Sequence, residues 1–209
     1  MARIIETTLY QFSELSPEAQ ENARDWYRQG IESWELSDSD YWQEVAKILG
    51  IEFKTRSIPL MNGKTRQEPC IYWRGFSNQG DGASWHGWYS YAKQAPARIR
   101  AYAPQDTKLH RIADELQALQ RPHFYRLQCT VTNGPGSNFY SHSGTMACDT
   151  SRVDGADCDD SLLTDAMCSF ADWIYRQLES QWEYLYSDES VDESIACNGY
   201  EFTESGEIA

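Results

Sequence analysis

The chain has 209 residues, enough for one domain with a sizeable core, and is rich in aromatic side chains, with 8 tryptophans and 13 tyrosines. No stretch approaches the roughly 18 consecutive apolar residues of a membrane-spanning helix, so we expect a cytoplasmic protein without a membrane partner. The formal net charge is −14, which disfavours direct binding to nucleic acid because phosphate contacts require lysine and arginine.

The first part of the chain predicts a strand followed by two helices. Residues 4–12 alternate loosely between apolar and polar side chains, which is typical of a strand. Ser16 and Pro17 then supply an N-cap and a first helical residue, and Gly30 supplies a C-terminal stop. A second helix is expected from about residue 38 to residue 49, because its apolar side chains recur with helical spacing.

Residues 70–93 are the stretch around which we expect the fold to be organised. Two aromatic-rich runs of alternating polarity predict a β-hairpin in this stretch. Its loop, residues 77–84, holds Asp81 between two glycines, which allow positive φ angles and can fix the carboxylate in one place.

The chain after this hairpin predicts a third helix and a second hairpin. The helix should cover residues 106–119, where apolar side chains follow a helical period. Residues 125–132 alternate clearly as a strand, and the turn sequence at residues 133–136 should return the chain through an antiparallel strand at residues 139–149.

The last quarter of the chain carries the whole charge imbalance. Residues 1–153 contain 17 acidic and 17 basic side chains, whereas residues 154–209 contain 15 acidic ones and a single basic one, Arg176. An apolar stripe over residues 163–185 predicts a long helix. Its carboxylates either keep the protein soluble or imitate the phosphates of a duplex and bind a cationic partner surface. The residues of this predicted partner-binding surface are Asp154, Asp157, Asp159, Asp160, Asp172, Glu179, Glu183, Asp188, Glu189, Asp192 and Glu193.

An alternative pocket combines Trp73, Gln79, Asp81, His86 and His142. If the two hairpins pair, these groups could converge as a metal site or an acid–base pair. The other interpretation is that Asp81 accepts loop N–H bonds while the histidines are hydrogen-bonded at a sheet edge. The sequence has no H-x-x-x-H, H-E-x-x-H or G-x-S-x-G spacing. We therefore assign no catalytic residue, no metal ligand and no cofactor.

Three stretches carry a resemblance to known sequences: residues 15–19 leading to residues 23–27, the string G-F-S-N-Q-G-D-G-A-S at residues 75–84, and, more weakly, residues 140–143. Through them the chain resembles a diffuse group of small, mostly uncharacterised proteins of phages and other mobile elements. Where that pattern usually continues with phenylalanine, this chain has Trp85. The resemblance implies a phage context and no catalytic residues. Analogy with small acidic inhibitors of host defence, such as anti-CRISPR proteins, favours an anti-defence role.

The sequence therefore predicts a single α+β domain over residues 1–209, with an antiparallel sheet built from two hairpins, helices packed on it, a neutral part at 1–153 and an acidic, mainly helical part at 154–209. We expect a non-enzymatic phage accessory protein in the host cytoplasm. It would inhibit a nucleic-acid-binding defence complex through its acidic, DNA-mimicking surface. The alternatives are a small enzyme or a ligand- or metal-binding protein that uses the alternative pocket, and an assembly protein whose exposed aromatic side chains form a homodimer.

Overall fold

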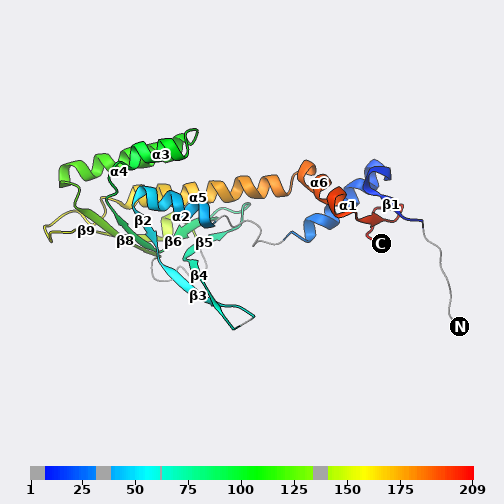
Figure 1. Ribbon diagram of the computed structural model, residues 1–209, viewed down its shortest axis with the longest axis horizontal. Coiled ribbons are helices and arrows are strands. Elements are labelled where there is room, and N and C mark those ends of the chain that lie inside the picture. Colours follow the sequence, from blue (N-terminus) through cyan, green and yellow to red (C-terminus); the bar gives the residue numbers. More distant parts are fainter. Residues whose placement is uncertain (1–7, 32–38, 62, 134–140) are drawn as a thin grey trace. The chain divides into compact units, whose positions relative to one another are not determined.

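The computed structural model describes residues 8–31, 39–61, 63–133 and 141–209 (Figure 1). The chain forms two units. The terminal unit contains residues 1–37 and 178–209, and the central unit contains residues 38–177. The predicted α+β class is confirmed, since helices and antiparallel strands both contribute. Among the described residues, no helix combines the length and the apolar character needed to cross a membrane.

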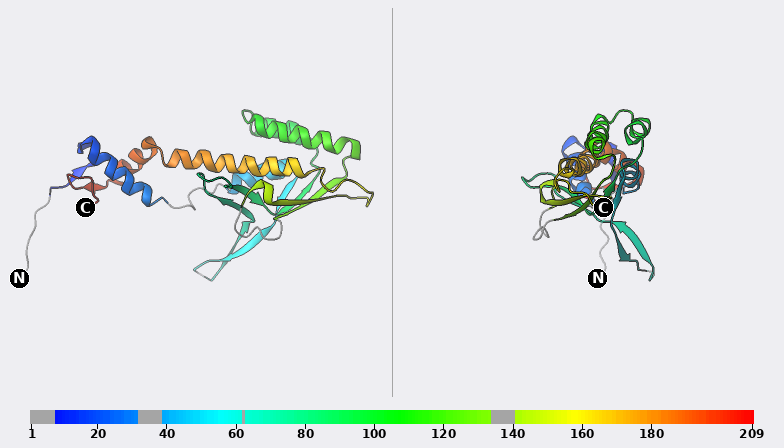
Figure 2. Two further views of the ribbon diagram at one scale, coloured as in Figure 1. Left: turned by 180° about the vertical axis from the view of Figure 1, so that it is seen from behind. Right: turned by 90° about the vertical axis from the view of Figure 1, so that its left-hand side faces the viewer.

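The helices of the central unit are α2 (Ser39–Leu49), α3 (Ala95–Tyr102), α4 (Thr107–Gln120) and most of α5 (Thr164–Leu185). They lie on one side of the strands (Figures 1 and 2). Helix α2 ends where predicted, at Gly50, whose φ of +90° is readily adopted only by glycine. Helix α4 confirms the helix predicted at residues 106–119, and the Asp106 carboxylate caps it by accepting a hydrogen bond of 2.9 Å from the Leu109 N–H.

A four-stranded antiparallel sheet contains, in this order, β2 (Ile51–Phe53), β7 (Gly87–Ser90), β8 (Leu127–Asn133) and β9 (Met146–Arg152). Strands β8 and β9 are the predicted second hairpin. Leu127, Cys129 and Val131 are buried on one face of β8, as the alternation predicted. The predicted turn after Asn133 lies outside the described residues.

The predicted central hairpin is one arm of a three-way junction of strand pairs. The arms are β2 with β7, β3 (Thr55–Pro59) with β4 (Thr65–Pro69), and β5 (Ile71–Arg74) with β6 (Gly82–Trp85). Lys54, Cys70 and His86 connect these arms through a ring of backbone hydrogen bonds. The Lys54 N–H donates to the His86 carbonyl (2.8 Å), and the His86 N–H donates to the Cys70 carbonyl (2.9 Å). The Cys70 N–H donates to the Lys54 carbonyl (2.7 Å) and closes the ring.

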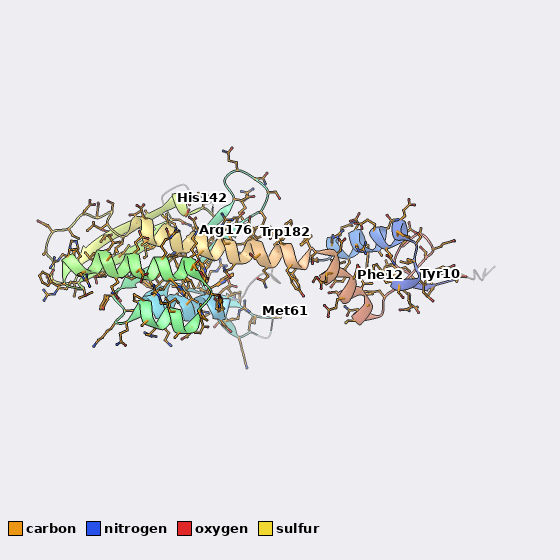
Figure 3. The ribbon with its side chains drawn as sticks, turned by 90° about the horizontal axis from the view of Figure 1, so that it is seen from above. Tyr10, Phe12, Met61, His142, Arg176 and Trp182 are labelled. Carbon is orange, nitrogen blue, oxygen red and sulfur yellow. The ribbon has the colours of Figure 1, made fainter. Side chains whose placement is uncertain are left out.

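This junction changes the predicted arrangement of the sheet. The chain changes its pairing partner at His86, so β6 pairs with β5 whereas β7 joins the four-stranded sheet. Within the first predicted hairpin, β5 and β6 therefore form a sheet of their own, whereas β7 pairs with β8 of the second predicted hairpin. The β3–β4 arm extends away from the helices as a two-stranded ribbon (Figures 1 and 2). Met61, at the ribbon tip, is fully exposed (Figure 3).

The core of the central unit lies between the strands and α5. Trp85 on β6 packs against Phe53 and Phe170, with ring centroids 5.6 Å and 6.1 Å apart. Trp173, one turn further along α5, is also buried and donates its indole N–H to the Asp106 carboxylate (2.7 Å). The apolar stripe predicted for this helix is therefore the side that the core buries.

The terminal unit is built from both ends of the chain. It contains β1 (Tyr10–Gln11), the 3₁₀ turn η1 (Phe12–Glu14), α1 (Pro17–Gln29), the end of α5, α6 (Asp188–Asn198) and β10 (Glu201–Phe202). Strands β1 and β10 pair antiparallel, and the Ser16 hydroxyl accepts the Ala19 N–H (3.3 Å) as the predicted cap of α1. Ala19, Ala23, Val191, Ile195 and Phe202 form its small core together with Leu15. Tyr10 and Phe12 pack against this core (Figure 3).

Candidate functional site

The loop between β5 and β6 is held by Asp81. Its carboxylate accepts hydrogen bonds from the backbone N–H groups of Asn78 (2.6 Å) and Ser77 (3.0 Å). Gly75 has a φ of +57°, and a Cβ atom there would lie 2.3 Å from the Asp81 Oδ2 atom, so this position requires glycine. The Asn78 and Ser77 N–H groups lower the pKa of Asp81 below its ordinary value of 3.8. The string G-F-S-N-Q-G-D-G-A-S at residues 75–84 therefore has a structural role: it closes this loop.

We expect Asp81→Ala to release this loop while the central unit stays folded, because only hydrogen bonds at the surface are lost. Amide exchange at Ser77 and Asn78 should become at least about tenfold faster. Since folding lowers the pKa of Asp81, its stabilising effect is complete above pH 3.8 and is lost as the pH falls through the folded-state pKa. The amide chemical shifts of both residues should follow that titration. Unchanged exchange, equal to that of the control Gln79→Ala, would contradict this role.

The two histidines of the alternative pocket serve as separate backbone acceptors. The Nε2 atom of His86 accepts a hydrogen bond from the Asn133 N–H (3.0 Å). Burial lowers the pKa of His86, which favours the neutral imidazole that this hydrogen bond needs. The Nδ1 atom of His142 instead accepts the Gly144 N–H (2.9 Å), while its ring lies against Gly82. Both histidines thus hold the backbone, as the structural interpretation of the sequence proposed.

The residues of the alternative pocket are not gathered into one ligand set. The His142 ring lies beside Gly82. Gly82 precedes His86 by four residues of extended chain, so the two positions are about 13 Å apart along the backbone. Trp73 stacks on Phe76, with centroids 5.5 Å apart, and Gln79 is exposed. In the part of the chain that the structure describes, no three His, Cys, Asp or Glu side chains lie close enough to hold a metal ion.

Five of the predicted partner-binding carboxylates lie in the central unit: Asp154, Asp157, Asp159, Asp160 and Asp172. Asp154 forms ion pairs with Arg152 (2.8 Å) and Arg126 (2.7 Å), and these arginines hold its pKa far below the ordinary value. Asp159 accepts hydrogen bonds from the hydroxyl (2.7 Å) and backbone N–H (2.9 Å) of Ser161, which lower its pKa. Asp154 and Asp159 are therefore already engaged within their own unit.

The other six lie in the terminal unit: Glu179, Glu183, Asp188, Glu189, Asp192 and Glu193. Two of them join α6 to α1. Asp192 binds Arg24 with both carboxylate oxygens, at 2.7 and 2.9 Å, and Asp188 forms an ion pair with Arg28. Glu189 and Glu193, in contrast, are exposed, and neither has an ion pair with any described residue. Their charge is available to a partner.

The terminal unit carries almost all of the net charge. Its 69 residues include 16 acidic and 3 basic side chains, a net charge of −13. The 140 residues of the central unit include 16 acidic and 15 basic side chains, a net charge of −1. The excess of acidic residues therefore belongs to the terminal unit, whose second segment begins at residue 178, and not to the whole stretch from residue 154 onward.

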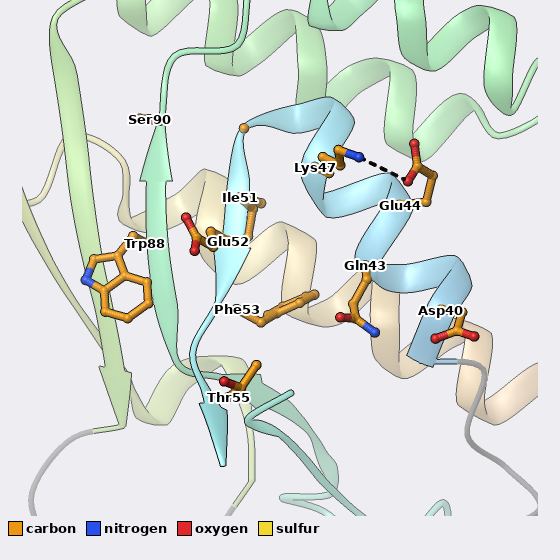
Figure 4. A pocket seen from close by; sticks show the side chains of 11 residues that line it. Asp40, Gln43, Glu44, Lys47, Ile51, Glu52, Phe53, Thr55, Trp88 and Ser90 are labelled. Atoms are coloured by element: carbon orange, nitrogen blue, oxygen red, sulfur yellow. Dashed lines mark ion pairs between the residues drawn. The ribbon is translucent and has the colours of Figure 1, made fainter. Parts of the chain in front are cut away.

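A pocket of about 730 Å³ lies beside the edge strand β2 of the central unit (Figure 4). Helix α2 contributes Asp40, Glu44 and Lys47, and the strands contribute Glu52 and Trp88. Lys47 pairs with Glu44 at 3.9 Å, and Trp88 is 47% exposed. Sequence analysis missed this pocket because a helix and three strands assemble it. Its one local signal was a tryptophan at an outward position of a strand.

The lining of this pocket includes four charged side chains, Asp40, Glu44, Lys47 and Glu52. Its described lining has carboxylates, one lysine and an indole, but neither an imidazole nor a thiol. Thr55 and Ser90 add two hydroxyl groups, and such a lining can contact a polar or cationic group.

Comparison with known proteins places the central unit within a described family. The family model with the description "Domain of unknown function (DUF8835)" matches residues 34–188. No curated protein and no solved structure matches the chain. The matched segment includes the whole central unit and α5, whereas α1, β10 and nearly all of α6 lie outside it.

Proposed function

The chain belongs to the family described as a domain of unknown function (DUF8835), and on this premise we propose a non-enzymatic protein whose terminal unit binds a basic, nucleic-acid-binding surface of a partner protein. The observation that carries the proposal is the net charge of −13 on the 69 residues of that unit. A field of this sign repels nucleic acid and attracts the surfaces that bind it. The setting that we propose, from the sequence resemblance, is a phage protein that inhibits a host defence complex.

The internal ion pairs of the terminal unit support this function. Arg24 and Arg28 are two of its three basic side chains, and both are paired with carboxylates inside the unit. The Arg24 guanidinium also lies over the Phe12 ring, 5.5 Å from its centroid. These contacts hold α1 and α6 together, so the remaining carboxylates are displayed by a fixed scaffold, which reduces the entropic cost of binding.

Two of these remaining carboxylates are positioned as a pair. Glu189 and Glu193 are four residues apart on α6, so they lie on the same helix face, about 6 Å apart at their Cβ atoms. Both are exposed. A rigid row of carboxylates imitates the regular negative charge of a nucleic-acid backbone, which is the ligand that a basic groove is shaped to hold.

Charge reversal at this pair tests the proposal. We expect Glu189→Lys with Glu193→Lys to weaken partner binding at least about tenfold, because both carboxylates are available to a partner and neither joins α6 to α1. The measurement is capture of proteins from a bacterial lysate by the full chain, with mass-spectrometric identification. The captured partner should be a nucleic-acid-binding protein that added duplex DNA or salt displaces.

The matched control is Asp157→Lys with Asp172→Lys, which changes the net charge equally but on the central unit. Both side chains are exposed, so binding should be retained. The proposal fails if the control and the Glu189 and Glu193 variant lose equal affinity. It also fails if the captured proteins resist displacement by DNA. The alternative pocket lacks a convergent ligand set, so we propose no second function there.

A further inference from the structure

We infer that the terminal unit contains a pocket for an organic cation, namely the guanidinium or ammonium group of an arginine or lysine side chain of the partner. The pocket has a volume of about 440 Å³, which lies within the usual range of small-ligand pockets. Three aromatic residues, Trp26, Tyr27 and Tyr200, line it together with the end of α1. This inference deepens the proposed function and rests on it for the identity of the partner.

The aromatic rings form a corner rather than a flat stack. The centroids of Trp26 and Tyr200 are 5.1 Å apart, and their planes meet at 82°. Tyr27 is 6.3 Å from each of them, with its plane inclined at 64° to Trp26 and 57° to Tyr200. All three side chains are half-buried, so they are held in place and still contribute surface to the pocket. The negative face of an aromatic ring attracts a cation, and several inclined rings can surround one.

The charges around this corner also favour a cation. None of the lining residues is charged, and the neighbouring Arg28 is occupied elsewhere, by Glu21 (3.0 Å), Asp25 (3.1 Å) and Asp188. Gly30, the C-cap of α1, lines the pocket, so the negative end of that helix dipole lies at it. The unit as a whole has a net charge of −13. An apolar group would fit the rings equally well but would gain nothing from this field.

Two peptides that differ only in charge test the assignment with the full chain. The first is acetyl-Gly-Arg-Gly-amide, and the second has citrulline, the neutral isostere, in place of arginine. Binding is followed by NMR through the indole N–H resonance of Trp26, which is assigned by its loss in Trp26→Phe. We expect the arginine peptide to shift this resonance and to bind at least about tenfold more tightly than the citrulline peptide.

Variants at Tyr200 show whether binding requires an aromatic ring or only a large side chain at this position. Tyr200→Leu should weaken binding of the arginine peptide at least about fivefold, whereas Tyr200→Phe, which keeps the ring, should retain it. Tyr184→Leu is the control, because Tyr184 belongs to the same unit, is 58% exposed and does not line the pocket. Equal binding of the two peptides, no shift of the Trp26 resonance, or an unaffected Tyr200→Leu would each overturn the inference.

These outcomes are independent of the charge-reversal experiment. If the arginine peptide fails to bind while partner capture still depends on Glu189 and Glu193, the pocket assignment is wrong and the proposed function stands. If the peptide binds but capture does not depend on those carboxylates, the pocket assignment stands and the proposed function is wrong.

Discussion

Replacing Trp85 by alanine should lower the free energy of unfolding by about 4 kcal/mol, which is typical of a large aromatic side chain removed from a packed core. Trp85 is fully buried and contacts both Phe53 and Phe170 edge to face, at interplanar angles of 86° and 81°. Its loss would leave a cavity between β6 and α5 that these rings cannot fill without leaving their own contacts. Urea unfolding followed by circular dichroism measures the change.

Trp85→Phe should change the free energy of unfolding far less than Trp85→Ala. The indole Nε1 atom of Trp85 is buried without an acceptor among the described residues, so the native side chain already carries an unsatisfied donor. Phenylalanine removes this donor and keeps most of the ring, so we expect the two effects to offset within about 1 kcal/mol.

The control for Trp85 is Trp88→Ala on the neighbouring strand β7. Trp88 is 47% exposed, so its removal should cost no more than about 1 kcal/mol. If Trp85→Ala were as mild as this control, or if Trp85→Phe were as damaging as Trp85→Ala, the packing argument would be wrong.

Gln120→Ala should lower the free energy of unfolding by about 3 kcal/mol, although the residue is polar. Gln120 is fully buried at the end of α4. Its amide donates to the Leu127 carbonyl (2.8 Å) and accepts the Leu127 N–H (3.0 Å), and it also donates to the Tyr89 hydroxyl (3.3 Å). Alanine leaves both backbone groups of Leu127 buried without partners at the start of β8.

The matched control for Gln120 is Gln117→Ala in the same helix. Gln117 is only half-buried, and alanine is the better helix former, so the free energy of unfolding should change by less than about 0.5 kcal/mol. Amide exchange at Leu127 provides a second readout, because its N–H loses the side-chain acceptor only in Gln120→Ala. Equal stabilities of the two variants would rule out the proposed role of Gln120.

Most of the helices could be predicted because their signals are local, but α3 (Ala95–Tyr102) was not predicted. Ser16 and Pro17 begin α1, Asp106 caps α4, and the apolar stripe of α5 recurs with the helical period. The loop of the central hairpin was predicted less well: it was placed at residues 77–84 but covers 75–81. Residues 82–85 are buried on both faces of β6, so they show no alternation that would mark them as a strand.

The candidate sites were harder to predict than the helices. Asp81 was recognised as a carboxylate held in one place, because glycines flank it in the sequence. The predicted partner-binding surface contained acidic residues chosen only by their position in the sequence. It therefore included Asp154, which forms ion pairs with Arg126 and Arg152. A charge count includes every carboxylate but does not show which basic side chain it pairs with. When that side chain lies on another strand or helix, no nearby sequence pattern reveals the ion pair.

The sequence by itself determined α1, α2, α4 and α5, the alternation of β8 and the total charge, since these depend on composition and on spacings of a few residues. Only the tertiary structure decided how that charge is distributed. Arg24 and Asp192 are 168 residues apart in sequence, yet their ion pair joins α1 to α6, and both ends of the chain share one acidic unit. The same folding brings Tyr200 to Trp26 and Tyr27. Contacts of this range depend on which surfaces bury each other, and no local pattern encodes them.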